Sequence, residues 1–309
     1  MTKISIIIPT FNRNKILEQT LSTVVKAIQN ISAEIIVVND SKNNDVTIKS
    51  ELLNKFILLN NPGSGVASAR NFGAKNATGN LLLFIDDDIL ISSENIQRTI
   101  ELHKLHPDDC FNFNWKYPES LLKELEETQF GRFLMNVKLI DYKGWVHHPN
   151  WNDNEIFEVS KLAAFFFVIP KNIFINAEGF NESFKNQSVE DDEFSARLVK
   201  SGVRLFIDPK HYVLHNESDK INLEARLKRL KTGAHNQRQA YDMGMKEYFI
   251  PYSLIKIVSY SVLSKIKTVL LLFCHLIPNL TVFDFFYRWL AHLLIGVVIF
   301  EGYYLKKNA

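Results

Sequence analysis

The chain has 309 residues, of which 46% are hydrophobic and 23% charged, and its formal net charge is only +2. This composition predicts a substantial packed core with an appendage, and it excludes a disordered chain. The near-neutral balance carries no polyanion-binding signature, so we expect no nucleic-acid partner. Cys110 and Cys274 lie far apart, which indicates neither a disulfide framework nor a zinc site and fits a reducing cytosol.

Short apolar runs alternate with helical patterns along the first hundred residues. We expect strands at 4–8, 34–38, 56–60 and 81–85, and helices near 13–29, 66–77 and 93–105. This alternation predicts an α/β fold with a mainly parallel sheet sandwiched by helices. Ligands of such sheets gather at the carboxyl ends of strands, which is where Thr10, Asp40 and Asp86–Asp88 stand.

The middle of the chain is interpreted as irregular and aromatic over residues 107–160, around a helix near 119–137. Its aromatic residues can stack on sugar rings, but ordinary packing is the favoured reading for each of them: Phe111, Phe113, Trp115, Tyr117, Trp145 and Trp151. Core patterns then return, with an apolar run at 162–169, a turn around Gly179, a helix at 189–201 and a strand at 203–207.

The C-terminal part changes character twice. Residues 222–243 predict a basic helix, which is most often a solvated face but can also touch anionic headgroups or a lipid diphosphate. Residues 251–309 combine an apolar background with six basic and two acidic side chains. Their longest charge-free stretches, Thr268–Phe283 and Trp289–Phe300, fall short of the roughly 20 residues that span a bilayer. We therefore expect interfacial amphipathic helices or a shallow hairpin, with a dimer interface as the alternative.

Three consecutive carboxylates, Asp86, Asp87 and Asp88, follow the apolar strand at 81–85. Such groups repel one another and resist desolvation, so they are tolerable chiefly where a cation and anionic phosphates neutralise them. The alternative is that they cap a helix starting near Ser92 and Ser93, although those serines are good caps themselves. The triple aspartate therefore indicates a metal–diphosphate site.

Several ordered segments, covering roughly residues 3–240, point the same way. They are Ile4–Arg13, Glu34–Ser41, Gly65–Asn71, Asp86–Asp88, Gly179–Glu182, Glu190–Asp192 and His215. In this order and at these separations the chain resembles the family 2 glycosyltransferases of bacterial surface-glycan type. The resemblance implies a GT-A (Rossmann-like) fold, an inverting reaction and a nucleotide-sugar donor.

The resemblance also implies roles at the donor site. Asp86, Asp87 and Asp88 match the family's Asp-x-Asp pattern, which supplies contacts to ribose and metal. The resemblance places Asp86 and Asp87 at the nucleotide sugar, and Asp88 is the first choice for direct ligation of Mn²⁺ or Mg²⁺, with Asp86 as a second ligand. His215 matches a late histidine that completes the metal or diphosphate site, although lone histidines are more often structural.

The same resemblance implies which residues contact the nucleotide. Asp40 matches the nucleobase contact or else begins an Asx turn, and Thr10 and Phe11 match the loop that lines base and ribose. Arg70 would reach base or diphosphate, or form a structural salt bridge.

The second acid cluster matches the family's Glu-Asp motif at the start of a helix. The resemblance places the catalytic base on Asp191, with Glu190 and Asp192 in supporting or acceptor-binding roles. The alternative is a capping box with Ser188, in which the helix amino terminus stabilises the carboxylate as an anion. One departure is the bulky run at 162–169, where many relatives carry a glycine-containing acceptor segment; it suggests a smaller or more apolar acceptor pocket.

The short apolar run that follows Lys3 and stops at Pro9 is too brief for a signal-peptide core, so export is not expected. We therefore expect an inverting glycosyltransferase at the cytoplasmic face of the membrane. Its donor would be a UDP-sugar rather than a GDP- or dTDP-sugar, and its acceptor would be a glycan on a lipid carrier. The oligomeric state is left open. The expected division is a catalytic domain at 1–218, a basic helical segment at 219–250 and membrane-associated or oligomer-forming helices at 251–309.

Two rivals stay open. A sugar-phosphate nucleotidyltransferase would need a glycine-rich loop after the first strand, where this chain has Pro9–Arg13. An inactive nucleotide-sugar-binding scaffold at the membrane would have no need of Asp191.

Overall fold

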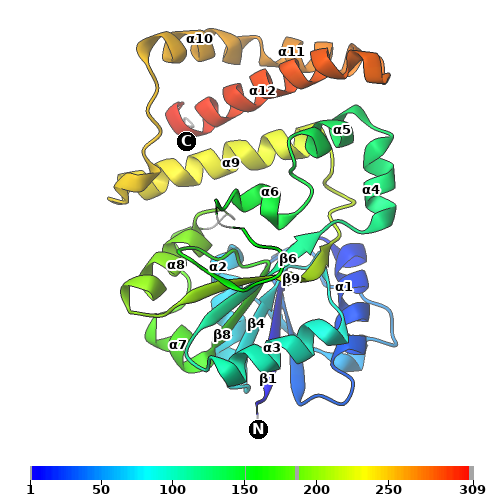
Figure 1. Cartoon of the computed structure of the whole chain (residues 1–309), viewed down its shortest axis with the longest axis vertical. Coiled ribbons are helices and arrows are strands. Elements are labelled where there is room, and N and C mark those ends of the chain that lie inside the picture. Colours follow the sequence, from blue (N-terminus) through cyan, green and yellow to red (C-terminus); the bar gives the residue numbers. More distant parts are fainter. Residues whose placement is uncertain (1, 150, 185–187, 306–309) are drawn as a thin grey trace. The chain divides into compact units, whose positions relative to one another are not determined.

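The computed structural model describes residues 2–149, 151–184 and 188–305. Contacts divide the chain into two compact units (Figure 1). The first comprises Met1–Pro118 and Asp141–Asn216, and the second comprises Glu119–Ile140 and Glu217–Ala309. An inserted segment and the C-terminal segment therefore build the second unit together.

The first unit is organised around one sheet. Within the described residues its path is β3-β2-β1-β4-β8-β6-β9-β5, with β7 paired to β9. The strands are β1 (Ile4–Thr10), β2 (Ala33–Asn39), β3 (Ile57–Asn60), β4 (Leu81–Ile85), β5 (Ile89–Leu90), β6 (Cys110–Lys116), β7 (Phe157–Val159), β8 (Phe166–Pro170) and β9 (Leu205–His215). Strands β1 to β4 are parallel to one another, whereas β8 runs antiparallel to both β4 and β6.

Helices flank this sheet, which confirms the predicted α/β class. They are α1 (Asn14–Ala27), α2 (Val66–Asn76), α3 (Ser93–Leu105), α6 (Tyr142–Val146), α7 (Lys171–Asn176) and α8 (Glu190–Lys200), with a 3-10 turn at Leu53–Lys55. The chain leaves β1 towards β2 and returns from β3 to β4, so right-handed crossovers place α1 and α2 on opposite faces. Gly73 lets α2 approach β1, since a Cβ there would lie 2.5 Å from Ile7 Cγ2.

The region interpreted as irregular contains a central strand, which corrects that prediction. In β6 aromatic residues alternate with asparagines, a pattern that normally indicates one face in the core and one in solvent. Both faces of this strand are buried, however, so the asparagines do not mark an exposed face. Asn112 is fully buried because its amide donates to the Ala163 and Phe166 carbonyls, while Tyr142 donates to its Oδ1. Phe111, Phe113, Trp115 and Tyr117 are likewise buried, so these aromatic side chains pack in the core.

The second unit is a helical bundle. It contains α4 (Glu119–Glu126), α5 (Gln129–Asn136), α9 (Leu223–Asp242), α10 (Leu254–Lys265), α11 (Lys267–Leu276) and α12 (Asp284–Tyr304), with 3-10 turns at Lys246–Tyr248 and Thr281–Phe283. The expected helix at 119–137 is therefore two helices, because Thr128 caps a new start at α5. Within this unit α12 lies between α9 on one side and α10 with α11 on the other (Figure 1).

Two helical stretches of this unit have the length and apolar composition of a membrane span. Thr281–Tyr304 qualifies by itself, with one third of its apolar window buried, and α10 with α11 qualifies as a pair bent by 69°. Lys306 and Lys307, which contribute to the basic count of the tail, lie outside the described residues.

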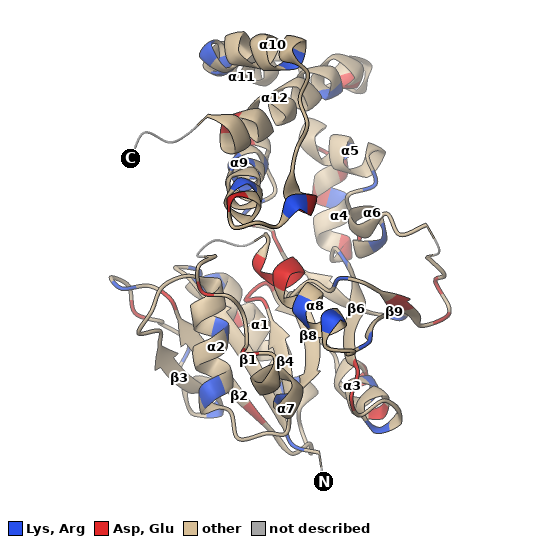
Figure 2. Ribbon diagram, turned by 90° about the vertical axis from the view of Figure 1, so that its left-hand side faces the viewer, with Lys and Arg blue, Asp and Glu red and all other residues tan. Residues whose placement is uncertain are grey.

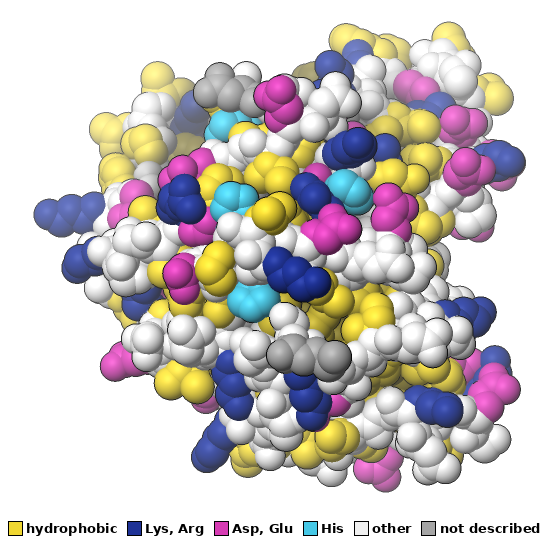
Figure 3. Space-filling model, turned by 60° about the horizontal axis from the view of Figure 1, so that its bottom comes forward, with side chains coloured by type: hydrophobic (Ala, Val, Ile, Leu, Met, Phe, Trp, Pro, Cys, Tyr) yellow, Lys and Arg dark blue, Asp and Glu magenta, His cyan; other side chains and the backbone are white. Residues whose placement is uncertain are grey.

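Charge is mixed on the surface. Figure 3 shows Lys and Arg side chains scattered among Asp and Glu on the face it draws, without a broad field of one sign. In Figure 2 the start of α8 is acidic and its end basic, an arrangement that complements the helix dipole.

Candidate active site

The triple aspartate lies where β4 ends, beside the end of the parallel strand β1. Asp87 and Asp88 are buried, at 6% and 4% exposure. Thr10, the last residue of β1, donates from Oγ1 to Asp87 Oδ2 at 2.7 Å, and Thr20 of α1 donates to the Asp87 carbonyl at 2.7 Å. Ser92 caps α3 together with Asn95, so the three aspartates do not serve as the cap of that helix.

Basic side chains of the chain itself compensate these carboxylates. Arg13 Nη1 contacts Asp87 Oδ1 and lies 2.8 Å from Asp88 Oδ2, and Arg70 Nη2 lies 2.9 Å from Asp86 Oδ1. The expectation that a metal ion and a diphosphate would be needed to balance the cluster is therefore incomplete. The sequence pattern assigned no role to Arg13, although a basic residue three positions after Thr10 was the available signal.

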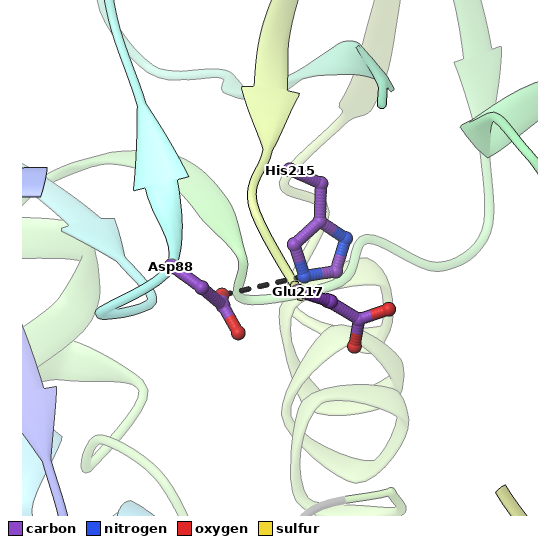
Figure 4. A group of neighbouring side chains, drawn as sticks. All are labelled: Asp88, His215 and Glu217. Atoms are coloured by element: carbon purple, nitrogen blue, oxygen red, sulfur yellow. Dashed lines mark ion pairs between the residues drawn. The ribbon is translucent and has the colours of Figure 1, made fainter. Parts of the chain in front are cut away.

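Asp88 and His215 form the candidate metal-ligating pair. His215 ends β9, and its Nε2 lies 3.3 Å from Asp88 Oδ1 (Figure 4). The Trp115 ring packs edge-on against the imidazole, with centroids 5.0 Å apart, and so restricts its orientation. Carboxylate oxygen suits Mn²⁺ and Mg²⁺, whereas imidazole nitrogen is a ligand of transition metals, so the pair favours Mn²⁺ over Mg²⁺. Glu217, two residues further along the chain, completes the group of three potential ligands drawn in Figure 4.

Arg70 joins the two acid clusters. Its guanidinium is 2% exposed, and its Nη1 lies 3.0 Å from Glu190 Oε1 while Nη2 holds Asp86. Burial by itself would lower the pKa of Arg70, but Asp86 and then Glu190 raise it above its ordinary value. The structural salt bridge that the sequence left open is thus present, and a contact of Arg70 with base or diphosphate stays a prediction.

Asp191 lies in the first turn of α8, where its Oδ2 accepts a hydrogen bond from the Ala164 amide at 3.2 Å. Burial raises the pKa of Asp191 to about 8, helped by repulsion from Glu190 and Asp192 and opposed by Arg70. The expected stabilisation of the anion by the helix terminus is thus outweighed. Among the described residues α8 shows no side-chain cap hydrogen bond, so the capping box with Ser188 does not form.

The flanking acids have different partners. Glu190 is 1% exposed, and its second oxygen accepts from the Ser188 and Val189 amides at 2.7 and 3.2 Å. Asp192 forms an ion pair with Lys161 at 2.8 Å. Glu190 therefore fixes the turn that carries Asp191, whereas Asp192 remains near the surface.

Asp40 ties the end of β2 to the start of α2. Both of its oxygens lie 3.0 Å from the Gly65 amide, and Oδ1 also accepts from Asn61 at 2.7 Å. Gly65 has φ +92°, a conformation that favours glycine. A nucleobase contact by Asp40 stays a prediction, while the ring of Phe11 is 58% exposed at the end of the neighbouring strand.

Sequence reasoning missed a polar pocket beyond β1 and β2. It has a volume of about 420 Å³, and it is lined by Asn12, Asn14, Asn39, Asn43, Asn44, Asp45 and Thr47. The signal available in the sequence was the group of asparagines at and after the end of the second strand. The side-chain amides that line the pocket can both donate and accept hydrogen bonds.

The phenylalanines of the 162–169 run lie in the core. Phe166 and Phe167 belong to β8 and are 0% and 2% exposed, paired with Ile85 and Phe84 of β4. Their bulk fills the interior of the sheet, and the inference of a smaller or more apolar acceptor pocket stays a prediction.

Comparisons with known proteins agree with this architecture. The model of "Glycosyl transferase family 2" matches residues 5–168, more than half of the chain. Over 252 residues the chain is 25% identical to validoxylamine A glucosyltransferase of Streptomyces hygroscopicus subsp. jinggangensis, covering 72% of this chain and 58% of the relative. It is also 25% identical over 232 residues to poly(ribitol-phosphate) beta-N-acetylglucosaminyltransferase TarP of Staphylococcus aureus, covering 72% and 65%. The chain thus spans under two thirds of these relatives.

Solved structures show the same fold. Mannosyltransferase PcManGT from Pyrobaculum calidifontis, in complex with GDP-Man and Mn²⁺, superposes with a TM-score of 0.56 at 12% identity, covering 99% of this chain and 88% of that one. GalNAc-T7 with UDP, GalNAc and Mn²⁺ gives 0.52 at 15% identity, covering 70% and 44%. These likenesses show the GT-A fold, and the match of the family model to more than half of the chain shows that the chain belongs to glycosyl transferase family 2.

Proposed function

We propose that this glycosyltransferase is an inverting, metal-assisted enzyme that moves a sugar from a nucleotide-sugar donor to an acceptor hydroxyl. The observation that carries the proposal is the buried Arg70, which contacts Asp86 of one acid cluster and Glu190 of the other. Arg70 thereby links the aspartates after β4, which suit a cation, to the acids of α8, which suit proton transfer. A protein that only binds the nucleotide sugar would need the first cluster but not the second.

The donor side rests on the end of β4. Asp88 and His215 would hold Mn²⁺ or Mg²⁺, which when bound supplies electrostatic stabilisation of the departing diphosphate. Thr10 and Arg13 fix Asp87 beside it. The asparagine-lined pocket would take the nucleotide moiety, and we retain a UDP-sugar as the first candidate although solved relatives were obtained with UDP and with GDP-Man.

The acceptor side rests on Asp191. Its carboxylate would take the proton of the acceptor hydroxyl while that oxygen bonds to the anomeric carbon and the bond to the diphosphate breaks on the opposite face. Because the pKa of Asp191 is about 8, its conjugate acid is matched to proton transfer near neutral pH. The acceptor would be a glycan or lipid-linked glycan, in keeping with the poly(ribitol-phosphate) named for one relative.

The test is a panel of nucleotide sugars, scored by thermal stabilisation with and without Mn²⁺ and then by transfer to glycan acceptors. We expect one donor to stabilise the protein only with the metal, and Asp191→Asn to retain that stabilisation but lose transfer. Equal stabilisation in EDTA would contradict the metal role, and unchanged turnover of Asp191→Asn would contradict the base.

The same experiment separates the rivals. A nucleotidyltransferase would consume a nucleoside triphosphate and a sugar phosphate, which family membership and the glycine-free loop after β1 both disfavour. A scaffold would bind the donor without turnover in the wild-type protein.

A further inference from the structure

Exposed apolar side chains concentrate on one part of the second unit. Of 26 large hydrophobic residues exposed in the described part of the chain, 14 lie between Leu254 and Trp289. On α10 they recur every four residues from Leu254 to Ile266, and on α11 at Val269, Leu272, Phe273 and Leu276. This outer apolar face, as we call the exposed set from Leu254 to Trp289, exceeds what single surface residues account for.

The opposite side of these helices is packed within the unit. Tyr260 of α10 lies against Gly296 of α12, where a Cβ would be 2.6 Å from the tyrosine oxygen. Gly302 of α12 lies against α9, where a Cβ would be 2.2 Å from the Lys231 carbonyl oxygen. The middle of α12 is thus enclosed by α9 and α10, so the apolar residues there cannot contact a membrane or another protein.

Buried charge argues against a span through α12. Glu301, near the end of α12, is 6% exposed and accepts from Lys231 of α9 at 2.6 Å and from Lys267 at 2.7 Å. Carrying α12 across a bilayer would take this ion-paired group, or the polar helix α9, towards hydrocarbon at high cost. The basic helix α9 packs mainly on the other side of α12, and at its first turn Glu224 pairs with His275 of α11 at 2.6 Å, so this acid is balanced by an imidazole.

Most of the charged side chains that the outer apolar face itself carries are basic. Lys256 and Lys265 are exposed on α10, and Arg288 stands next to Trp289. Asp284 is the only acid in the sequence between residues 251 and 300, and Arg132 holds it through two contacts of 2.7 and 2.8 Å. An apolar surface with lysines and arginine at its border and its single acid neutralised is complementary to anionic headgroups above acyl chains.

We propose that α10, α11 and the first turns of α12 lie in the interfacial plane of an anionic lipid bilayer, with Phe273, Phe286 and Trp289 inserted below the headgroups. The occupant is the bilayer surface, rather than a second copy of the chain or a spanned membrane. This inference adds a membrane surface to the proposed function, but it depends only on the second unit and not on the transferase chemistry.

The test is flotation of the full-length protein with vesicles of phosphatidylcholine alone or with 30% phosphatidylglycerol. We expect binding to the anionic vesicles and at least about tenfold weaker partitioning for Leu272→Glu/Phe273→Glu, since both side chains would leave the acyl region. Lys256→Glu/Lys265→Glu should weaken binding only to anionic vesicles. Leu105→Glu, at a 69% exposed position of α3, is the matched control and should bind as the wild type does.

The depth to which the helices insert into the bilayer is measured from the fluorescence of Trp289. Brominated acyl chains should quench tryptophan fluorescence of the wild type and lose most of that quenching in Trp289→Phe. Three results would overturn the proposal: no binding to anionic vesicles, equal binding by the double glutamate variant, or resistance of the bound protein to alkaline carbonate, which indicates a span.

A second copy as occupant is tested by light scattering without lipid. A dimer that Leu272→Glu/Phe273→Glu converts to a monomer would also overturn the proposal. Donor-dependent thermal stabilisation of the same variants keeps this result separate from the proposed function: loss of vesicle binding with intact donor response concerns the membrane alone.

Discussion

The pH dependence of transfer is the most direct test of Asp191 as the base, because protonation of this carboxylate should abolish its activity as a base. The pKa of Asp191 is about 8, so at pH 7 only about 9% of the free enzyme carries the carboxylate, against about 91% at pH 9. A general base works in its deprotonated form. We therefore expect kcat/KM to rise about tenfold between pH 7 and pH 9 and to level off above that pH.

The assay is the pH profile of kcat/KM for transfer, in buffers of constant ionic strength. Asp191→Asn should lose at least about 100-fold in kcat and the rising limb of the profile with it. Asp192→Asn removes one repelling charge, so the pKa of Asp191 should fall and the profile should shift to lower pH. Asp108→Asn, in the exposed turn before β6, is the control and should leave the midpoint in place.

A stability measurement checks the same pKa without turnover. Asp191 binds its proton up to about pH 8 in the folded protein, whereas its ordinary value is 3.8, so its contribution to stability declines as pH rises between these values. Asp191→Asn should therefore gain stability relative to wild type at pH 8.5 compared with pH 5, measured by urea unfolding. A profile that is flat or falls between pH 7 and 9, with no such gain, would refute the reasoning.

Three other substitutions probe the network and the bundle. Asp88→Asn should abolish the Mn²⁺ dependence of UDP binding, measured by calorimetry; retention would remove Asp88 as a ligand. Arg70→Met leaves Asp86 and Glu190 without their buried cation and should cost about 3–5 kcal/mol in urea unfolding, a result that a surface pair could not produce. Gly302→Ala places a Cβ against the Lys231 carbonyl and should cost about 1–3 kcal/mol, with the exposed Ser259→Ala as control.

Local pattern was enough to predict the first half of the fold. Continuous apolar runs bounded by polar residues mark β1, β2 and β4, and the parallel arrangement brings Thr10 next to the triple aspartate. The sequence did not predict β6, because the buried Asn112 of this strand donates to the carbonyl of Ala163, 51 residues away, and local pattern carries no sign of such a distant partner. The helix pair at 119–137 likewise gave no hint that it packs with residues 217–309.

The residue types of the site could be read from the sequence, but their partners could not. Three adjacent aspartates indicate a charged site whatever surrounds them, because repulsion and desolvation act at short range. That Arg13 compensates Asp87, or that Arg70 reaches Glu190 across 120 residues, depends on how the chain closes. The sequence alone thus determined where negative charge gathers. Only tertiary structure decided which cations balance it and that burial raises the pKa of Asp191, because desolvation depends on neighbours that are remote along the chain.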